Sequence, residues 1–151
     1  MPEKSNKVTS VILSGVGGQG VLLAARILSE TALRAGEDVK SSEVHGMSQR
    51  GGSVLAQVRF GPRVFSPLTP VGGGDFMMAQ EELEALRYRE LLGEGALIIL
   101  RRLRIAPSTV IGGAAEYPDG IEENLRRSGY TVIGVDESEI EKLENYRFGN
   151  V

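Results

Sequence analysis

The chain has 151 residues, of which 41% are hydrophobic and 25% charged, values that are ordinary for one globular domain with a sizeable core. Its formal net charge of −3 gives no electrostatic reason to expect nucleic acid or an anionic membrane surface as a partner. The absence of cysteine excludes disulfides, thiolate catalysis and cysteine-held iron–sulfur clusters in this chain. No apolar run approaches the ~20 residues of a membrane span, and residues 1–7 lack a signal-peptide core, so we expect cytoplasmic residence.

The first predicted elements are a strand, a helix and a second strand. Val11–Leu13 is apolar and begins with two β-branched residues, and the helix from Val21 to about Ala35 repeats apolar residues at i, i+3, i+4 and i+7. Gly36 is a suitable helix stop. Asp38–Val44 is the second strand and closes a βαβ unit, which is normally right-handed with parallel strands.

The next segment changes the expected character of the sheet. Residues 45–52 have no hydrophobic period and contain three glycines, which predicts a loop. Ser53–Phe60 alternates between apolar and polar positions as a strand does. After a turn at Gly61–Arg63, Val64–Phe65 is expected to return as a short antiparallel strand. The sheet is therefore predicted to be mixed.

The second half alternates strands with helices. The predicted strands are Asp75–Ala79, Ala96–Leu100, Thr109–Ile111 and Tyr130–Val135. The predicted helices are Gln80–Leu92 with Leu83, Leu86 and Leu91 or Tyr88 inward, Ile121–Ser128 ended by Gly129, and Glu137 to about Tyr146 capped by Asp136. Arg101–Arg104 is interpreted as a solvated strand end or turn.

This order of elements predicts an α/β fold, namely a three-layer Rossmann-like domain with a mixed, mainly parallel sheet. We expect residues 1–8 to form a polar N-terminal tail and residues 9–151 to form a single domain. The chain stops soon after its last predicted helix, so the domain is either naturally short or truncated at its C-terminus.

A glycine-rich turn links the first strand to the first helix. Gly15–Gly20 matches G-x-G-x-x-G, and a helix start offers unpaired N–H groups with a partial positive charge, which suits a phosphate. Two interpretations stay open: the turn binds a phosphate- or nucleotide-type ligand, or it is a tight turn that binds nothing. The candidate cofactor-binding residues here are Gly15, Gly17, Gly18, Gln19 and Gly20.

The loop at residues 45–52 supplies the other candidate residues. His45 is the only histidine, so no metal site is expected; it serves as an acid–base group or anion ligand, or it holds the loop by hydrogen bonds. Ser48 has no second histidine for a triad, which argues against a serine hydrolase. Arg50 is suited to grip a phosphate or carboxylate, or to pair with a partner chain. Gln49 and Gly51 complete the candidate set.

A complete dinucleotide-dependent dehydrogenase is not expected. Glu43 lies near the position, about 20 residues after the glycines, where an acidic residue would bind a ribose. However, no second nucleotide-binding half follows, and His45 is the only candidate base for hydride chemistry.

The two motifs together resemble a known family. The chain resembles the gamma subunit or gamma domain of 2-oxoacid:ferredoxin oxidoreductases, which act on pyruvate or ketoisovalerate among other acids. The resemblance lies in Gly15–Gly20 with Val21–Ala24, then in Ser42–Gly52, and then in Ser66–Leu68. The His45–Gly52 form most resembles the small (beta) subunit of indolepyruvate ferredoxin oxidoreductase. The resemblance covers residues 9 to about 100.

The resemblance implies a division of labour. Thiamine diphosphate, Mg and iron–sulfur clusters are expected on a large partner chain, which decarboxylates the 2-oxoacid and passes electrons to ferredoxin. This chain would complete the assembly, with coenzyme A as a possible ligand of its glycine turn and loop. Small subunits of this type are expected to continue past Gly149–Asn150 into further helices. The alternative is a stand-alone nucleotide- or coenzyme A-binding module without catalysis.

Overall fold

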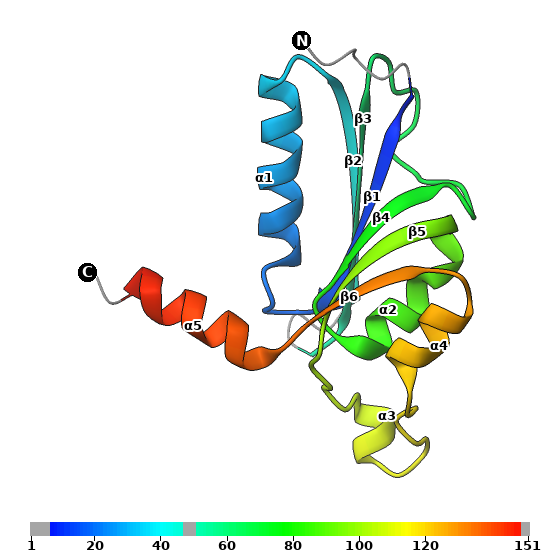
Figure 1. Ribbon diagram of the computed structural model, residues 1–151, viewed down its shortest axis with the longest axis vertical. Helices are drawn as coiled ribbons and strands as arrows, with labels where there is room; N and C mark the ends of the chain where they lie inside the picture. Colours follow the sequence, from blue (N-terminus) through cyan, green and yellow to red (C-terminus); the bar gives the residue numbers. More distant parts are fainter. Residues whose placement is uncertain (1–6, 47–50, 149–151) are drawn as a thin grey trace.

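The structure is a computed structural model that describes residues 7–46 and 51–148, with side chains up to residue 142. The described residues form a sheet in the order β2-β3-β1-β4-β5-β6 (Figure 1). Its strands are β1 (Thr9–Val16), β2 (Asp38–His45), β3 (Ser53–Gly61), β4 (Gly74–Ala79), β5 (Leu92–Arg101) and β6 (Thr131–Val135). The helices are α1 (Val21–Arg34), α2 (Glu82–Tyr88), α3 (Ser108–Ile111), α4 (Ile121–Arg127) and α5 (Glu137–Phe148). No described helix is both long enough and apolar enough to cross a membrane.

The sheet is mixed and mainly parallel, as predicted. β1, β4, β5 and β6 pair in parallel, whereas β3 pairs antiparallel with both β1 and β2. β1 and β2 therefore run in the same direction, as a βαβ unit requires, but they are not neighbours because β3 lies between them. An interior place suits β3, since Val54–Val58 is buried on both faces of the sheet.

The helix α1 covers one half of one sheet face, over β1, β2 and β3 (Figure 1). Its predicted apolar stripe is confirmed: Val21, Ala25 and Ala32 are buried, and Leu22 and Leu28 pack against the same core. The predicted stop is also confirmed, because Gly36 has a φ of +82° directly after the helix end.

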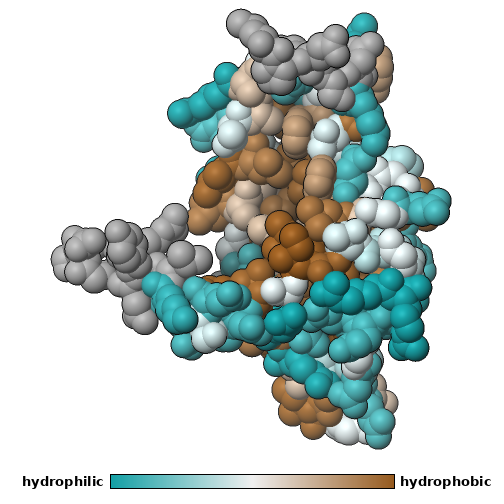
Figure 2. Space-filling view, viewed as in Figure 1, coloured by the Kyte–Doolittle hydropathy of each residue, from teal (hydrophilic) through white to brown (hydrophobic). Residues whose placement is uncertain are grey.

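The opposite face is covered by α2 and α4, which pack over β1 and β4–β6. Their core includes Ile12, Met77, Ile98, Leu100 and Leu125, each at most 1% exposed. The two helix layers are offset, so the α1 side of β4–β6 stays open. Phe76, Ile99 and Ile133 are 43%, 43% and 51% exposed there. Figure 2 shows hydrophobic side chains gathered between α1 and α5, which projects away from the sheet in Figure 1.

Two predicted short strands are wrong. Val64 and Phe65 do not form a strand. The amide of the buried Val64 donates instead to a side chain, Asp38 Oδ2, at 2.7 Å. Thr109–Ile111 belongs to α3, a single helical turn that begins after Pro107 and ends at Gly112. Proline before and glycine after the turn outweigh the strand preference of the β-branched residues.

The predicted helix over Gln80–Leu92 is shorter than expected. α2 begins at Glu82, a 3-10 turn follows at Arg89–Leu91, and Leu92 is already the first residue of β5. Leu86, Tyr88 and Leu91 pack against the core as predicted, whereas Leu83 is not among the described residues that pack there. The buried residues of α2 are Ala85 and Glu84. The helix Ile121–Arg127, with Gly129 at φ +93°, and α5 begin where predicted.

The basic cluster at the end of β5 is engaged in ion pairs. Arg101 pairs with Glu137, and Arg102 contacts Glu122 at 2.8 Å and Asp136 at 3.0 Å. Arg104 pairs with Asp119 and lies 4.4 Å above the Tyr117 ring. The predicted strand end is confirmed, and its charges hold the C-terminal elements together. Asp136, the predicted cap of α5, accepts a hydrogen bond from Arg102 with its carboxylate. Its amide donates to the Glu139 carboxylate at the start of α5.

Replacing Glu122 with glutamine should destabilise the protein in a pH-dependent way. Hydrogen bonds from Arg102 and Arg126 lower the pKa of Glu122 from 4.5 to about 2. A lowered native pKa stabilises the fold above pH 4.5, and that contribution is lost as the pH falls toward 2. Because both arginines are partly exposed, solvent screening limits the expected loss at pH 7 to about 1–2 kcal/mol.

Urea unfolding of the Glu122→Gln variant at pH 7 and at pH 3 measures this effect. Glu123→Gln is the matched control, because Glu123 is an exposed acid in the same first turn of α4. The gap between Glu122→Gln and wild type should narrow at pH 3. An equal loss at both pH values would contradict an electrostatic origin.

Candidate ligand pocket

A pocket of about 340 Å³ opens where β1, β2 and β3 meet the start of α1. The two motifs singled out in the sequence supply most of its walls. Its lining residues are Val16, Gly17, Gly18, Gly20, Val21, Leu22, Leu23, His45, Gly46 and Val54. Within the described residues, His45 is the only ionisable side chain that lines it.

The reversed direction of β3 brings the two motifs together. β1 ends at Val16 and β2 ends at His45, while β3 begins at Ser53. The antiparallel register places Val16 opposite Ser53 and His45 opposite Val54. The glycine turn and the His45 loop therefore leave the sheet at the same edge, beside the N-terminus of α1.

Some backbone amides of the glycine turn donate hydrogen bonds within the described part of the chain, and others do not. The Gly17 amide donates to the Gly52 carbonyl at 2.9 Å, and the Gln19 amide donates to the Val16 carbonyl at 3.1 Å. The amides of Gly18 and Gly20 make no hydrogen bond within residues 7–46 and 51–148. Both glycines line the pocket, as do Val21–Leu23 of the first turn of α1, whose amides have no partner inside the helix.

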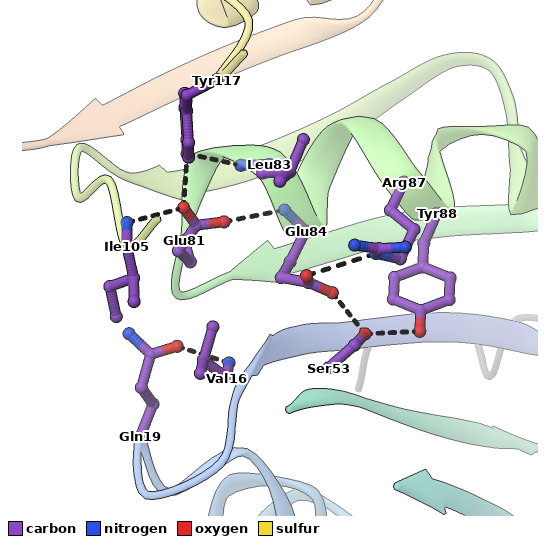
Figure 3. A network of polar contacts seen from close by, with 10 residues as sticks. All are labelled: Val16, Gln19, Ser53, Glu81, Leu83, Glu84, Arg87, Tyr88, Ile105 and Tyr117. Atoms are coloured by element: carbon purple, nitrogen blue, oxygen red, sulfur yellow. Dashed lines mark hydrogen bonds and ion pairs between the residues drawn. The ribbon is translucent and has the colours of Figure 1, made fainter. Parts of the chain in front are cut away.

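Gln19 and Gly15 shape the turn from inside the protein. The Gln19 Oε1 accepts the Val16 amide at 2.7 Å, as Figure 3 shows, and its Nε2 donates to the Gln80 carbonyl at 3.0 Å. A Cβ on Gly15 would lie 2.8 Å from both Gln19 Oε1 and a Val21 methyl. These two candidate residues therefore have identified structural roles, whether or not a ligand also touches them.

The other candidates are distributed around the loop. His45 is exposed at the pocket wall. The amide of the next residue, Gly46, donates a hydrogen bond to the Ser53 carbonyl at 3.3 Å. Ser48, Gln49 and Arg50 lie outside the described residues. Gly51 is exposed with a φ of +78°.

The residues considered for dinucleotide and metal chemistry are not assembled here. Glu43, at the position expected of a ribose-binding acid, does not line the pocket. The described residues contain no group of three or more histidine, aspartate or glutamate side chains arranged to hold a metal ion.

Behind the pocket lies a polar network that the sequence did not predict. Ser53 Oγ donates to Glu84 Oε2 at 2.5 Å and lies 2.7 Å from the Tyr88 hydroxyl (Figure 3). Glu84 Oε1 also accepts from Arg87 Nε at 3.2 Å, although the Glu84 side chain is only 5% exposed. The network links α2, on one side of the sheet, to the first residue of β3.

A second buried carboxylate, Glu81, caps α2. It accepts the amides of Glu84 at 2.9 Å and Ile105 at 3.0 Å, and also the Tyr117 hydroxyl. Burial, and then the Glu81 carboxylate, raise the pKa of Tyr117 by disfavouring its phenolate. The available sequence signal was position: Glu81 lies two residues after the end of a predicted strand and three residues before Glu84, the spacing of a helix cap.

The sequence profile of pyruvate ferredoxin/flavodoxin oxidoreductases matches residues 10–151. The chain belongs to this family, which confirms the resemblance seen in its motifs. It is 47% identical over 133 residues to the indolepyruvate oxidoreductase subunit IorB of Archaeoglobus fulgidus, covering 87% of this chain and 66% of the relative. It is also 47% identical over 112 residues to IorB of Thermococcus kodakarensis, covering 74% of this chain and 55% of the relative.

Solved structures share the fold at lower sequence identity. The pyruvate oxidoreductase subunit PORC of Thermotoga maritima is 20% identical with a TM-score of 0.61, covering 89% of this chain and 65% of that one. A 2-oxoglutarate:ferredoxin oxidoreductase of Magnetococcus marinus, solved with coenzyme A, is 18% identical with a TM-score of 0.58, covering 85% and 20%. The chain thus spans two thirds or less of the length of these relatives.

Proposed function

We propose that this chain is the small, gamma-type subunit of a cytoplasmic 2-oxoacid:ferredoxin oxidoreductase, with an indolepyruvate-like acid as substrate. The observation that carries the proposal is the 47% identity to proteins named as subunits of indolepyruvate oxidoreductase. The chain contains no cysteine, so the electron-transfer clusters belong to a partner. That large partner would also hold thiamine diphosphate and Mg, and ferredoxin would accept the electrons. Pyruvate and 2-ketoisovalerate are the other acids that the family resemblance suggests.

Coenzyme A is the ligand we assign to the pocket. The open amides of Gly18 and Gly20, with those of the first turn of α1, suit phosphate oxygens, and helix N-termini favour anions. The apolar side chains of Val21, Leu22 and Val54 suit the uncharged part of the ligand. His45 and Arg50 would supply hydrogen bonds or positive charge from the loop, without a catalytic role assigned to His45.

Native mass and composition of the complex that co-purifies with the chain from its own cells test the subunit assignment. A large thiamine- and iron–sulfur-containing partner, with indolepyruvate-dependent reduction of ferredoxin or a viologen dye, is the expected result. A monomer or homodimer without such a partner would overturn the assignment and favour a stand-alone coenzyme-binding module. Reduction with pyruvate or 2-ketoisovalerate alone would retain the subunit and change its substrate.

Gly18→Asp should weaken coenzyme A binding at least tenfold more than Gly18→Asn. Both residues accept the positive φ of +98° at this position better than most, and a Cβ there meets no atom of the described residues within 4 Å. The two variants differ mainly in a negative charge, which repels a phosphate. Binding to the complex is measured by calorimetry with coenzyme A. Equal affinities of the two variants for coenzyme A would show that its phosphate does not bind at the glycine turn.

Arg50→Ala tests the loop in the same assay. If both coenzyme A binding and assembly of the complex stay intact, Arg50 has neither of its proposed roles.

A further inference from the structure

The pocket is fastened at one point, where the loop rejoins the sheet at Gly52 and Ser53. The Gly52 carbonyl accepts the amide of Gly17 from the glycine turn at 2.9 Å. The Ser53 carbonyl accepts the amide of Gly46 from the His45 wall at 3.3 Å. The two opposite walls of the pocket are therefore both bonded to this dipeptide, and its position sets their separation.

The side chain of Ser53 is in turn held from α2. Because a serine hydroxyl has one proton and an ionised carboxylate only accepts, the 2.5 Å contact runs from Ser53 to Glu84. The Tyr88 hydroxyl, 2.7 Å away, must then donate to Ser53. Ser53 thus has both a fixed acceptor and a fixed donor, which leave its hydroxyl one orientation.

Holding the start of β3 with the buried carboxylate of Glu84 has a desolvation cost. Its side chain is 5% exposed, and burying a charge costs free energy unless strong hydrogen bonds compensate. Here the compensating bonds come from Ser53 and from Arg87. An apolar pair at positions 53 and 84 would fill the same space but would lack the directional hydrogen bonds that hold residue 53, the neighbour of the pocket residue Val54.

We propose that Ser53 and Glu84 are positioning residues of the pocket, which fix the spacing between its glycine turn and its His45 wall and thereby set the affinity for coenzyme A. This inference rests on the proposed function for its ligand, but its geometric part is independent of that ligand. Neither residue touches the pocket space itself. Both act through Gly52 and through the backbone of Ser53.

Ser53→Ala, made in the assembled complex, tests the proposal. We expect the KM for coenzyme A to rise about five- to tenfold, with kcat changed by less than twofold. Hydrogen exchange of a peptide covering residues 15–20 should accelerate at least tenfold, because the Gly17 amide loses its fixed acceptor. Ser53→Thr retains the hydroxyl and should restore both values. Glu84→Gln should shift both in the same direction as Ser53→Ala.

Glu90→Gln is the matched control, since Glu90 is an exposed acid in the 3-10 turn that follows α2. It should leave KM and exchange unchanged. A lower melting temperature in Ser53→Ala with unchanged exchange at residues 15–20 would overturn the proposal, as would faster exchange with an unchanged KM. If Gly18→Asp and Gly18→Asn have already shown that no phosphate binds, exchange alone decides whether Ser53 positions the turn.

Discussion

Replacing Glu81 with alanine should lower the free energy of unfolding by about 3 kcal/mol, because it removes a helix cap and leaves two further donors without their acceptor. Glu81 is 1% exposed and accepts from the amides of Glu84 and Ile105 and from the Tyr117 hydroxyl. These donors come from α2 and from the segment between β5 and α4. Loss of the carboxylate therefore also loosens that segment.

Urea unfolding at pH 7 measures this effect, and Glu82→Ala is the control one residue away. Glu82 is partly buried, and burial raises the pKa of its carboxyl. Its removal relieves a desolvated charge, so the expected change is within about 0.5 kcal/mol. If Glu81→Ala costs as little as Glu82→Ala, the three donors have found other partners and the cap is dispensable.

Gly15→Val should destabilise the protein by about 3 kcal/mol through overpacking. A Cβ at Gly15 would lie 2.8 Å from Gln19 Oε1 and from a Val21 methyl, and 3.0 Å from Gln80 Cβ. Gln19 cannot move away freely, because it bonds both the Val16 amide and the Gln80 carbonyl. The valine would therefore disrupt the packing of the turn, and the proposed coenzyme A binding should be lost with it.

Gly46→Ala provides the contrast on the opposite wall of the same pocket. Within the part of the chain that the structure describes, a Cβ on Gly46 meets no atom within 4 Å, so the free energy of unfolding of Gly46→Ala should match that of wild type. Denaturant titration of both variants measures the difference. Equal stability of Gly15→Val and Gly46→Ala would show that the turn adapts to side chains, and that the glycine at position 15 is not required for packing.

Local chemistry was enough to predict the first half of the fold up to β3. The apolar spacing of α1 and the glycine at position 36 depend on residues close in sequence, and both were confirmed. The position of β3 between β1 and β2 could not be predicted from local sequence in the same way. Alternation in Ser53–Phe60 identifies a strand, but the choice of neighbours is settled by tertiary packing.

The missed elements have a similar cause. Val64 is a β-branched residue of the type that favours strands, but its amide donates to Asp38, a carboxylate distant in sequence. Thr109 is β-branched, yet it lies in one helical turn between a proline and a glycine. In both places a tertiary contact or a helix boundary outweighed the intrinsic preference of the residue.

The candidate pocket was predicted in part. Gly15–Gly20 and His45 were singled out, and the structure brings both segments to one pocket. The polar support behind it was missed, because Glu81 and Glu84 look like solvent-facing acids of an amphipathic helix. Their burial follows from α2 being short and from the hydroxyls of Ser53 and Tyr117, which reach them from positions 31 and 36 residues away.

The offset of the two helix layers affects how this chain behaves in water. Phe76, Ile99 and Ile133 lie on three adjoining strands of the open sheet face, with Ile99 directly opposite Ile133. Water that borders such a surface is released when two apolar faces meet, and that release favours association. Salts that strengthen the hydrophobic effect will increase the tendency. These three side chains therefore favour association of the isolated chain with another apolar surface.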